Sequence, residues 1–347
     1  MMTHTDATEL LKRLIAIPSV SRDEKAVADF LEEQLKQQGL APMRHHNNLW
    51  CVGRAQRPNR PTLLLNAHID TVKPAAGWQC DPFTPLLEGE RLYGLGSNDC
   101  GGGLVSLLAV FTQLEKRTDI PWNLVFLASA EEEVSGKNGI ESVIPLLPHI
   151  DCAIVGEPTG MQPAIAEKGL MVLDCTAHGR AGHAARNEGD NAIYHAIDDI
   201  QWVRTFQFPN VSPLLGPVKM SVTIVQAGTQ HNVVPDACTF TIDVRSNECY
   251  TNQMLLEEIS AHLQSDVKAR STRLSSSSIF PAHPLVRRAE ALGRRPFGSP
   301  TLSDQALMPW PSLKMGPGES SRSHTAGEYI GLQEIEEGIA LYLKLLE

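Results

Sequence analysis

The sequence predicts an α/β fold: a mostly parallel sheet with helices on both faces, interrupted by a smaller α+β domain. Three apolar runs, at residues 62–66, 124–128 and 153–155, have the length and composition of buried strands. An apolar helix pattern at 104–114 lies between the first two, and alternation of strands with helices indicates a parallel sheet covered on both sides. After residue 171 the pattern changes to the period-two alternation of half-exposed antiparallel strands.

Helix patterns surround the buried runs. Apolar residues recur at helical spacing in residues 10–15 and again in residues 27–35. The first predicted helix ends before Pro18 and the second ends at Gly39. A last helix is expected over 332–346. These elements belong to one domain, which we expect to span residues 1–171 and 282–347.

The interrupting segment, residues 172–281, is expected to form the second domain. Alternating strands are predicted at 173–177, 220–225 and 239–244, with helices at 192–203 and 254–263. A compact α+β unit with one sheet and two helices follows from this order.

Composition excludes several classes of protein. With 42% hydrophobic residues in 347, the chain can build a core, which argues against disorder. The 30 basic against 40 acidic residues give a formal charge of −10, which argues against a nucleic-acid partner. No apolar run approaches the ~20 residues of a membrane helix, and the polar first residues show no secretory pattern. Seven scattered cysteines without a CxxC pair suggest neither disulfides nor a thiolate zinc site, so we expect a soluble cytoplasmic protein.

Ionisable residues follow each buried run directly. The first run leads into His68 and Asp70, the second into Glu131-Glu132-Glu133, and the third into Glu157. In parallel α/β folds the functional residues gather beyond the carboxyl ends of the strands. Taken alone, each motif also fits a surface turn or a solvated acidic loop.

Two further motifs complete a ligand set. Asp99 stands in a glycine-flanked segment before a helix, where it would also serve as an N-cap, and His324 follows the distant Gly316-Pro317-Gly318. Two imidazoles and three carboxylates suit a pair of zinc ions held by nitrogen and oxygen. The adjacent glutamates allow one to bind metal while its neighbour acts as general base to a bound water. The predicted ligands are His68, Asp99, Glu133, Glu157 and His324.

The interrupting segment adds three polar candidates. His183 lies in a turn of small residues, Asn232 in a polar loop between two strands, and Arg245 at the end of the second of these strands. Without other context, these are ordinary turn residues and a surface arginine.

Taken together and in this order, the motifs resemble the two-zinc aminoacylase/carboxypeptidase family of metallopeptidases. The resemblance covers nearly the whole chain and implies a catalytic domain interrupted by a lid or dimerisation domain. It implies that His68 and Glu157 hold one zinc ion and that Glu133 and His324 hold the other. Asp99 would bridge the two ions, and Asp70 would orient His68. Two Zn²⁺ ions per subunit are therefore expected, with Co²⁺ as a substitute.

The resemblance also implies roles in catalysis and binding. Glu132 corresponds to the general base, and His183 to a lid histidine that reaches the site of a partner chain in a homodimer and stabilises the oxyanion. Asn232, Arg245, Lys168 and Gly316 resemble substrate-binding positions.

One departure concerns the residues after Asp99. The family usually has a hydrophobic residue and then Lys-Gly, whereas this chain has Cys100-Gly101-Gly102. The change in charge near the site bears on the choice of substrate.

The resemblance implies a deacylase of N-acyl amino acids. Because Lys168 is closer to the acetylornithine deacetylase pattern, we expect N-acetylornithine, or an N-acetyl or N-succinyl derivative of ornithine or citrulline in arginine biosynthesis. The alternatives within the family are an N-succinyl-diaminopimelate desuccinylase and a dipeptidase. Outside it stand a single-metal hydrolase and a non-catalytic dimeric relative, although the latter would be expected to lose a ligand or the base.

Overall fold

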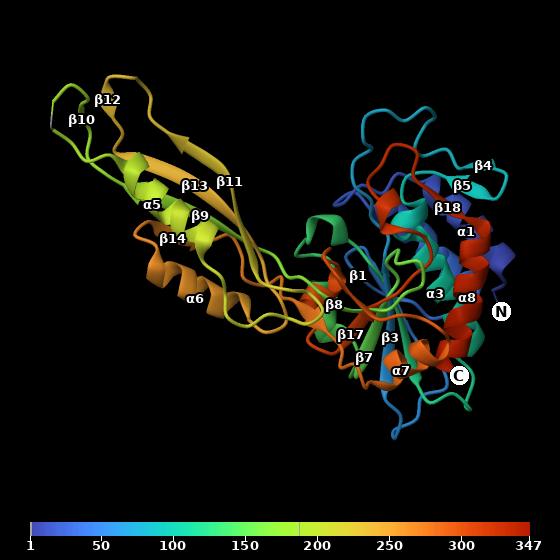
Figure 1. Cartoon of the computed structure of the whole chain (residues 1–347). Coiled ribbons are helices and arrows are strands. Elements are labelled where there is room, and N and C mark those ends of the chain that lie inside the picture. Colours follow the sequence, from blue (N-terminus) through green and yellow to red (C-terminus); the bar gives the residue numbers. More distant parts are fainter. Residues whose placement is uncertain (1, 187) are drawn as a thin grey trace. The chain divides into compact units, whose positions relative to one another are not determined.

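The computed structural model describes residues 2–186 and 188–347, and they form two compact units (Figure 1). The first unit comprises the chain up to Ile165 together with Ser278–Phe297 and Ser303–Glu347, and the second comprises Ala166–Ser277 with Gly298–Leu302. Among the described helices, none combines the length with the apolar character that crossing a bilayer requires.

The first unit is built on a mixed sheet with the strand order β1-β2-β6-β3-β7-β17-β8. Its central strands β6, β3, β7 and β17 run parallel, and β2 is antiparallel to β6. All seven residues of β3 and of β6 are buried, as expected for parallel strands covered on both faces. The bounds are β1 Met43–His45, β2 Asn48–Val52, β3 Thr62–His68, β6 Asn123–Ser129, β7 Cys152–Val155, β8 Ala164–Glu167 and β17 Ser312–Lys314. The short strands β15 (Ser277–Ser278) and β16 (Phe297–Ser299) span boundaries between the two units.

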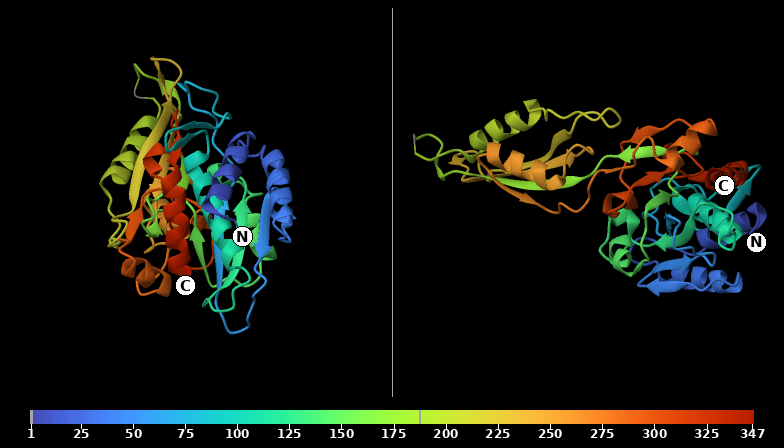
Figure 2. Two further views of the ribbon diagram at one scale, coloured as in Figure 1. Left: turned by 90° about the vertical axis from the view of Figure 1, so that its right-hand side faces the viewer. Right: turned by 90° about the horizontal axis from the view of Figure 1, so that it is seen from below.

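Helices cover both faces of this sheet. The apolar helix α3 (Gly102–Leu114) packs on one face, where Phe111 contacts Phe126 of β6 with ring centroids 5.9 Å apart. On the other face, Val125 of the same strand packs with α4 (Ile140–Val143). Both views of Figure 2 show α8 (Leu332–Leu346) beside α3. The predicted α/β class is confirmed. The other helices are α1 His4–Ile15, α2 Lys25–Gln37 and α7 Pro284–Ala291.

Close packing of glycines positions the end of β7. A Cβ atom on Gly103 would lie 1.7 Å from the carbonyl oxygen of Gly156. The first turn of α3 therefore packs directly against the residue that precedes Glu157, and any larger side chain at position 103 would push the two apart.

A small antiparallel sheet brings together two distant segments of the first unit. Its order is β18-β5-β4, with β4 Leu86–Glu88, β5 Arg91–Tyr93 and β18 Tyr329–Gly331. Because β5 precedes Asp99 and β18 follows His324, this pairing places both candidate ligands on neighbouring loops.

The second unit is an antiparallel sheet with helices on one side. The strand order is β11-β13-β9-β14, with β9 Met171–His178, β11 Lys219–Ala227, β13 Ala237–Arg245 and β14 Asp266–Ala269. Alternate residues of β9 are buried, and they form a core with α5 (Ala192–Thr205) and α6 (Asn252–His262). Three expected strands and both helices are present. β14 and the short pair β10 (Gly182–His183) and β12 (Val233–Val234) were not predicted, because they are too short to show a period.

Away from the candidate site, the ion pair of Arg54 with Glu115 makes the free energy of unfolding depend on pH. Glu115, at the end of α3, is 3% exposed and accepts bonds of 2.6–3.0 Å from the guanidinium of Arg54. Burial raises the pKa of Glu115, but the bonds from Arg54 outweigh it and hold the pKa below its usual value. Because the folded pKa is the lower one, the stabilisation is complete above the unfolded pKa of about 4.3 and is lost as pH falls through the folded pKa.

We therefore expect Glu115→Gln to lower the free energy of unfolding near neutral pH and to have progressively less effect below a pH of about 4. Urea unfolding of the two chains across this range measures the difference. A deficit that stays constant down to the acid limb would show that the charge of Glu115 does not contribute.

Candidate metal centre

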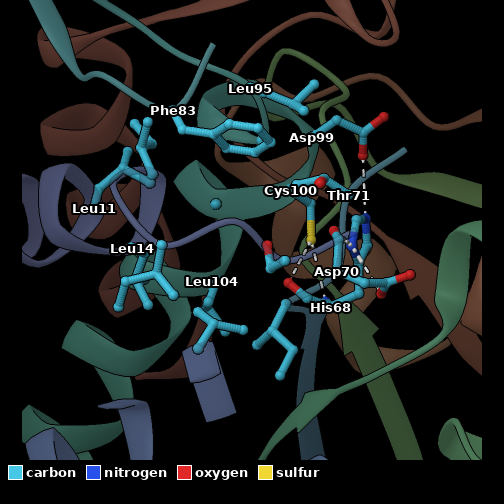
Figure 3. Close-up of a pocket in the computed structure, with 17 residues that line it drawn as sticks. Leu11, Leu14, His68, Asp70, Thr71, Phe83, Leu95, Asp99, Cys100 and Leu104 are labelled. Carbon is cyan, nitrogen blue, oxygen red and sulfur yellow. Dashed lines mark hydrogen bonds and ion pairs between the residues drawn. The ribbon is translucent and has the colours of Figure 1, made fainter. Parts of the chain in front are cut away.

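Three parallel strand ends deliver candidate ligands to one edge of the sheet in the first unit. β3 ends at His68, which pairs in register with Ser129, the last residue of β6. β7 ends two residues before Glu157. The η1 turn (Ser97–Gly101) and the loop before β18 add Asp99 and His324. Figure 3 shows His68, Asp70, Asp99 and Cys100 grouped at this edge.

His68 lies at the centre of the group. Its Nε2 atom is 3.2 Å from Oδ1 of Asp99, 3.6 Å from Oε1 of Glu157 and 4.0 Å from Oε2 of Glu132. The imidazole is 1% exposed, so these acids meet it in a largely water-free site.

Asp99 lies between the two histidines. Its Oδ1 faces His68, while its Oδ2 is 3.5 Å from Nε2 of His324. The same His324 nitrogen is 2.9 Å from Oε2 of Glu133. A carboxylate that turns one oxygen to each of two imidazoles has the arrangement of a ligand shared by two cations. The structure thus brings all five predicted ligands together.

The donor atoms fall into two groups that share His68. In each, the candidate atoms lie within 4.8 Å of one another: His68, Asp99 and Glu133 in one, and His68, Cys100 and Glu157 in the other. Cys100 was not a candidate from the sequence, since its neighbours come from other strands and no cysteine motif marks it. Its thiol also accepts a hydrogen bond of 3.2 Å from the His68 backbone N–H.

The buried acids of the site repel one another, and the hydrogen bond to Glu133 raises the pKa of His324 to about 9. Burial, and then the Asp99 carboxylate, raise the pKa of Glu157 to about 8. Burial, and then Glu157, raise the pKa of Glu132 well above its usual value. Oε1 of Glu157 is buried and has no hydrogen-bond partner among the described residues. Mutually repelling buried carboxylates of this kind favour bound cations, and carboxylate oxygens together with imidazole nitrogens suit zinc.

Apolar side chains form one wall next to Cys100. A small cavity of about 30 Å³ lies behind Cys100, lined by Leu11 and Leu14 of α1 and Leu104 of α3 (Figure 3). Such a wall keeps the local dielectric constant low, which strengthens the electrostatic interactions of the ligands.

Asp70 organises two parts of the site. Nδ1 of His68 is 2.9 Å from the backbone oxygen of Asp70 and 3.6 Å from its carboxylate. The carboxylate itself accepts bonds from the backbone N–H groups of Glu132 (3.0 Å) and Glu133 (3.1 Å) and from the Ser21 hydroxyl (2.7 Å). Asp70 therefore holds the loop of Glu132 and Glu133 in addition to lying next to His68.

The three consecutive glutamates have different surroundings. Glu131 has a left-handed backbone (φ 54°), and its carboxylate accepts bonds from Asn138. Glu132 and Glu133 face His68 and His324 respectively.

A buried acid beside the site was missed by the motif analysis. Asp304 is 4% exposed, and its Oδ2 accepts a 2.6 Å bond from the hydroxyl of Ser129 at the end of β6. Burial raises the pKa of Asp304 to about 6. Nothing in the spacing around Asp304 relates it to Ser129, which lies 175 residues earlier.

The remaining candidates lie in three places. Gly316, in the first unit, packs against Glu157, whose backbone oxygen would be 2.5 Å from a Cβ atom at position 316. In the second unit, exposed His183 pairs with Val233, and the backbone oxygen of Asn232 accepts a 3.0 Å bond from Ala184, so His183 and Asn232 are neighbours.

Arg245 and Lys168 form a separate group of the second unit. Arg245 is held by Asp243 through bonds of 2.8 and 3.1 Å. Lys168 donates to the backbone oxygen of Pro217, and burial, then the charges of Lys219 and Arg245, lower its pKa. Arg245 closes β13, whereas Asn232 precedes it, so the two pairs lie towards opposite ends of this strand.

The chain is similar to curated proteins over nearly its whole length. The chain is 27% identical over 361 residues to a succinyl-diaminopimelate desuccinylase of Corynebacterium glutamicum, covering 98% of this chain and 96% of the relative. It is 29% identical to a putative succinyl-diaminopimelate desuccinylase of Mycobacterium tuberculosis, covering 98% of both.

Solved structures share the fold. A tripeptidase of Staphylococcus aureus matches with a TM-score of 0.77 at 20% identity, over 100% of this chain and 98% of that one. A dinuclear metal-binding peptidase of Bacillus subtilis from the M20 family matches with a TM-score of 0.73 at 17% identity, over 99% and 98%. The model of peptidase family M20/M25/M40 matches residues 64–347, so the chain belongs to this family of metallohydrolases.

Proposed function

We propose that this protein hydrolyses the amide bond of an N-acyl amino acid with two divalent cations, Zn²⁺ or, as a substitute, Co²⁺. His68 and Glu157 would hold one ion, Glu133 and His324 the other, and Asp99 both. The observation that carries this proposal is the position of Asp99, with one oxygen toward each imidazole. The buried Oε1 of Glu157, which has no hydrogen-bond partner among the described residues, supports a cation at this donor set.

When bound, such a pair lowers the pKa of a water molecule toward neutrality and polarises a carbonyl. Glu132 would take the proton of the water that attacks the amide carbon, and would deliver it to the nitrogen as the carbon–nitrogen bond breaks. A carboxylate with a raised pKa suits both transfers near neutral pH. Asp70 keeps Glu132 in place through its backbone N–H.

Residues of the second unit would complete the reaction. His183 would donate a hydrogen bond to the oxyanion in the site of a partner chain. Arg245 and Lys168, with Asn232, would bind the carboxylates of the substrate, since a guanidinium pairs with a carboxylate through two parallel bonds. Gly316, packed against Glu157, would line the pocket.

The substrate assignment follows the relatives. The pattern at Lys168 favoured N-acetylornithine, but both curated relatives described above are named as succinyl-diaminopimelate desuccinylases. N-succinyl-diaminopimelate is therefore the first substrate to test, with N-acetyl and N-succinyl derivatives of ornithine and citrulline second and dipeptides third. The two cations Lys168 and Arg245 agree with an acyl group that carries its own carboxylate.

The test is hydrolysis of this panel by the purified, zinc-loaded protein. Turnover of the diaminopimelate compound alone would establish a desuccinylase, and turnover of an ornithine or citrulline derivative would establish the deacylase of arginine biosynthesis. If the panel is not hydrolysed while two metals are bound, the N-acyl amino acid is the wrong substrate class.

A homodimer through the second unit forms part of this proposal. β11 is an outer strand of its sheet and carries no charged residue between Met220 and Ala227. Its Val225 is 54% exposed, and Tyr194 and Ile197 on the adjoining α5 are 67% and 53% exposed. An uncharged, apolar outer strand is a template for pairing with another chain, and a second copy would present the same strand.

Val225→Lys is therefore expected to convert the dimer into a monomer, because pairing would bury the added charge. Light scattering of the purified chain measures the mass. Val211→Lys, which changes a valine that is 57% exposed elsewhere in the second unit, should remain dimeric. A wild-type monomer, or a dimeric Val225→Lys chain, would contradict this surface.

A further inference from the structure

A buried carboxylate outside the predicted ligand set holds the loop that carries Asp99. Glu328 lies four residues after His324 and is 1% exposed. Its Oε1 accepts hydrogen bonds from the backbone N–H groups of Asn98 (2.8 Å) and Asp99 (2.9 Å), and its Oε2 accepts one from Gly96 (3.1 Å). One side chain thus binds three backbone donors of the segment that presents Asp99, those of Gly96, Asn98 and Asp99.

A second side chain makes the reciprocal connection. Asn98, which is fully buried, accepts a 3.0 Å bond from the backbone N–H of Glu319 through Oδ1. Its Nδ2 donates to the backbone oxygen of Glu319 (3.1 Å) and to the hydroxyl of Ser323 (3.3 Å). Glu328 therefore reaches from the His324 loop to the Asp99 turn, and Asn98 reaches back. We refer to these two residues as the clamp.

In the part of the chain that the structure describes, the buried carboxyl group of Glu328 is bound only by backbone donors, and burial raises its pKa to about 7. A buried carboxylate is costly unless its partners compensate, and the structure records no cation within ion-pair distance of Glu328 among the described residues. Backbone N–H groups alone satisfy it. The two oxygens of the carboxyl group bind three backbone donors at once and so fix their relative positions.

We propose that Glu328 is a positioning residue: through the clamp it sets the distance between Asp99 and His324, and thereby the affinity of the metal position that these two ligands share. This inference rests on the proposed two-metal function. Glu328 touches neither substrate nor the candidate donor atoms, so its effect is transmitted through the backbone of Asp99. Outer partners of metal ligands typically change metal affinity by about 10–100-fold.

The experiment measures metal binding without substrate. Metal-free wild type and Glu328→Gln are titrated with Zn²⁺ and Co²⁺ against a chromophoric chelator, and the visible spectrum of bound Co²⁺ is recorded at one and two equivalents. Gln keeps the shape but turns an N–H group toward backbone donors. We expect the site that contains Asp99 and His324 to lose about 10–100-fold in affinity, with a changed Co²⁺ spectrum once that site is occupied.

Two further variants separate positioning from general stability. Asn98→Ala removes the clamp from its other side and should show the same weakened site, even if Glu328→Gln folds poorly. Asp199→Asn is the matched control, because Asp199 is also buried and accepts backbone bonds, from Gln264 (3.0 Å) and Ser265 (2.9 Å), but belongs to the second unit and binds no part of the Asp99 turn or the His324 loop. It should keep wild-type metal affinities even if its melting temperature falls.

Wild-type affinity and spectrum in both folded clamp variants would overturn the proposal, as would an equal loss in Asp199→Asn. The proposed function fails separately: a wild-type chain that binds two metals normally but hydrolyses no N-acyl amino acid would leave the clamp result intact. A wild-type chain that binds only one equivalent would overturn both.

Discussion

Glu132→Gln is expected to lower turnover by about 10²–10⁴-fold while both metals stay bound, because it removes the proton acceptor and no predicted ligand. Glu132 faces His68 at 4.0 Å from within the cluster, and its loop is held by Asp70 through the backbone, which the substitution leaves unchanged. Steady-state rates with the best substrate of the panel, together with metal content, measure the effect.

The neighbouring glutamate supplies the control. The carboxylate of Glu131 binds Asn138, so Glu131→Gln should retain turnover within a few-fold. Near-wild-type turnover by Glu132→Gln, or an equal loss in both variants, would assign the base to another residue.

His324→Ala is expected to reduce bound metal from two equivalents to one and to abolish most of the turnover. His324 contacts Glu133 at 2.9 Å and Asp99 at 3.5 Å, so its removal deprives one cation of its only imidazole in the proposed set, whereas His68 and Glu157 are untouched. Since outer partners alone are worth about 10–100-fold in affinity, loss of a direct ligand should exceed that range. Elemental analysis after dialysis measures the stoichiometry.

A second histidine–carboxylate pair provides the comparison. His149 is 83% exposed and lies 3.2 Å from Asp151 on the surface of the first unit, so His149→Ala should retain both metals. Two tightly bound equivalents in His324→Ala would exclude His324 as a ligand and leave Asp99 without the second cation.

Much of the fold could be predicted because buried strands and helix faces consist of apolar residues whose spacing is visible in the sequence. β3, β6 and β7 are covered on both faces, so they read as continuous apolar runs, and β9 shows alternate burial because only one of its faces packs on helices. β14, β10 and β12 have only two to four residues, so their pairing depends on neighbours that no local pattern reveals.

The candidate site divides in the same way. That the candidate ligands after buried strands lie close together was predictable, since parallel strands deliver their carboxyl ends to one edge. Cys100, Asp304 and Glu328 have no such marker: each meets its partner through a contact that spans 32 to 232 residues. The carboxylate of Asp70, expected beside His68, also binds the backbone of Glu132 and Glu133, which a two-residue spacing cannot reveal.

The sequence alone predicts the α/β class and the types and chain positions of the candidate metal ligands, because hydrophobic periodicity and residue chemistry are local properties. Only the tertiary structure decided that Asp99 faces both histidines, that Glu131 turns away while Glu132 turns in, and that Glu328 binds the Asp99 turn. These are distances between segments far apart in the chain, and they are set when packing excludes water and each buried polar group must find its partner.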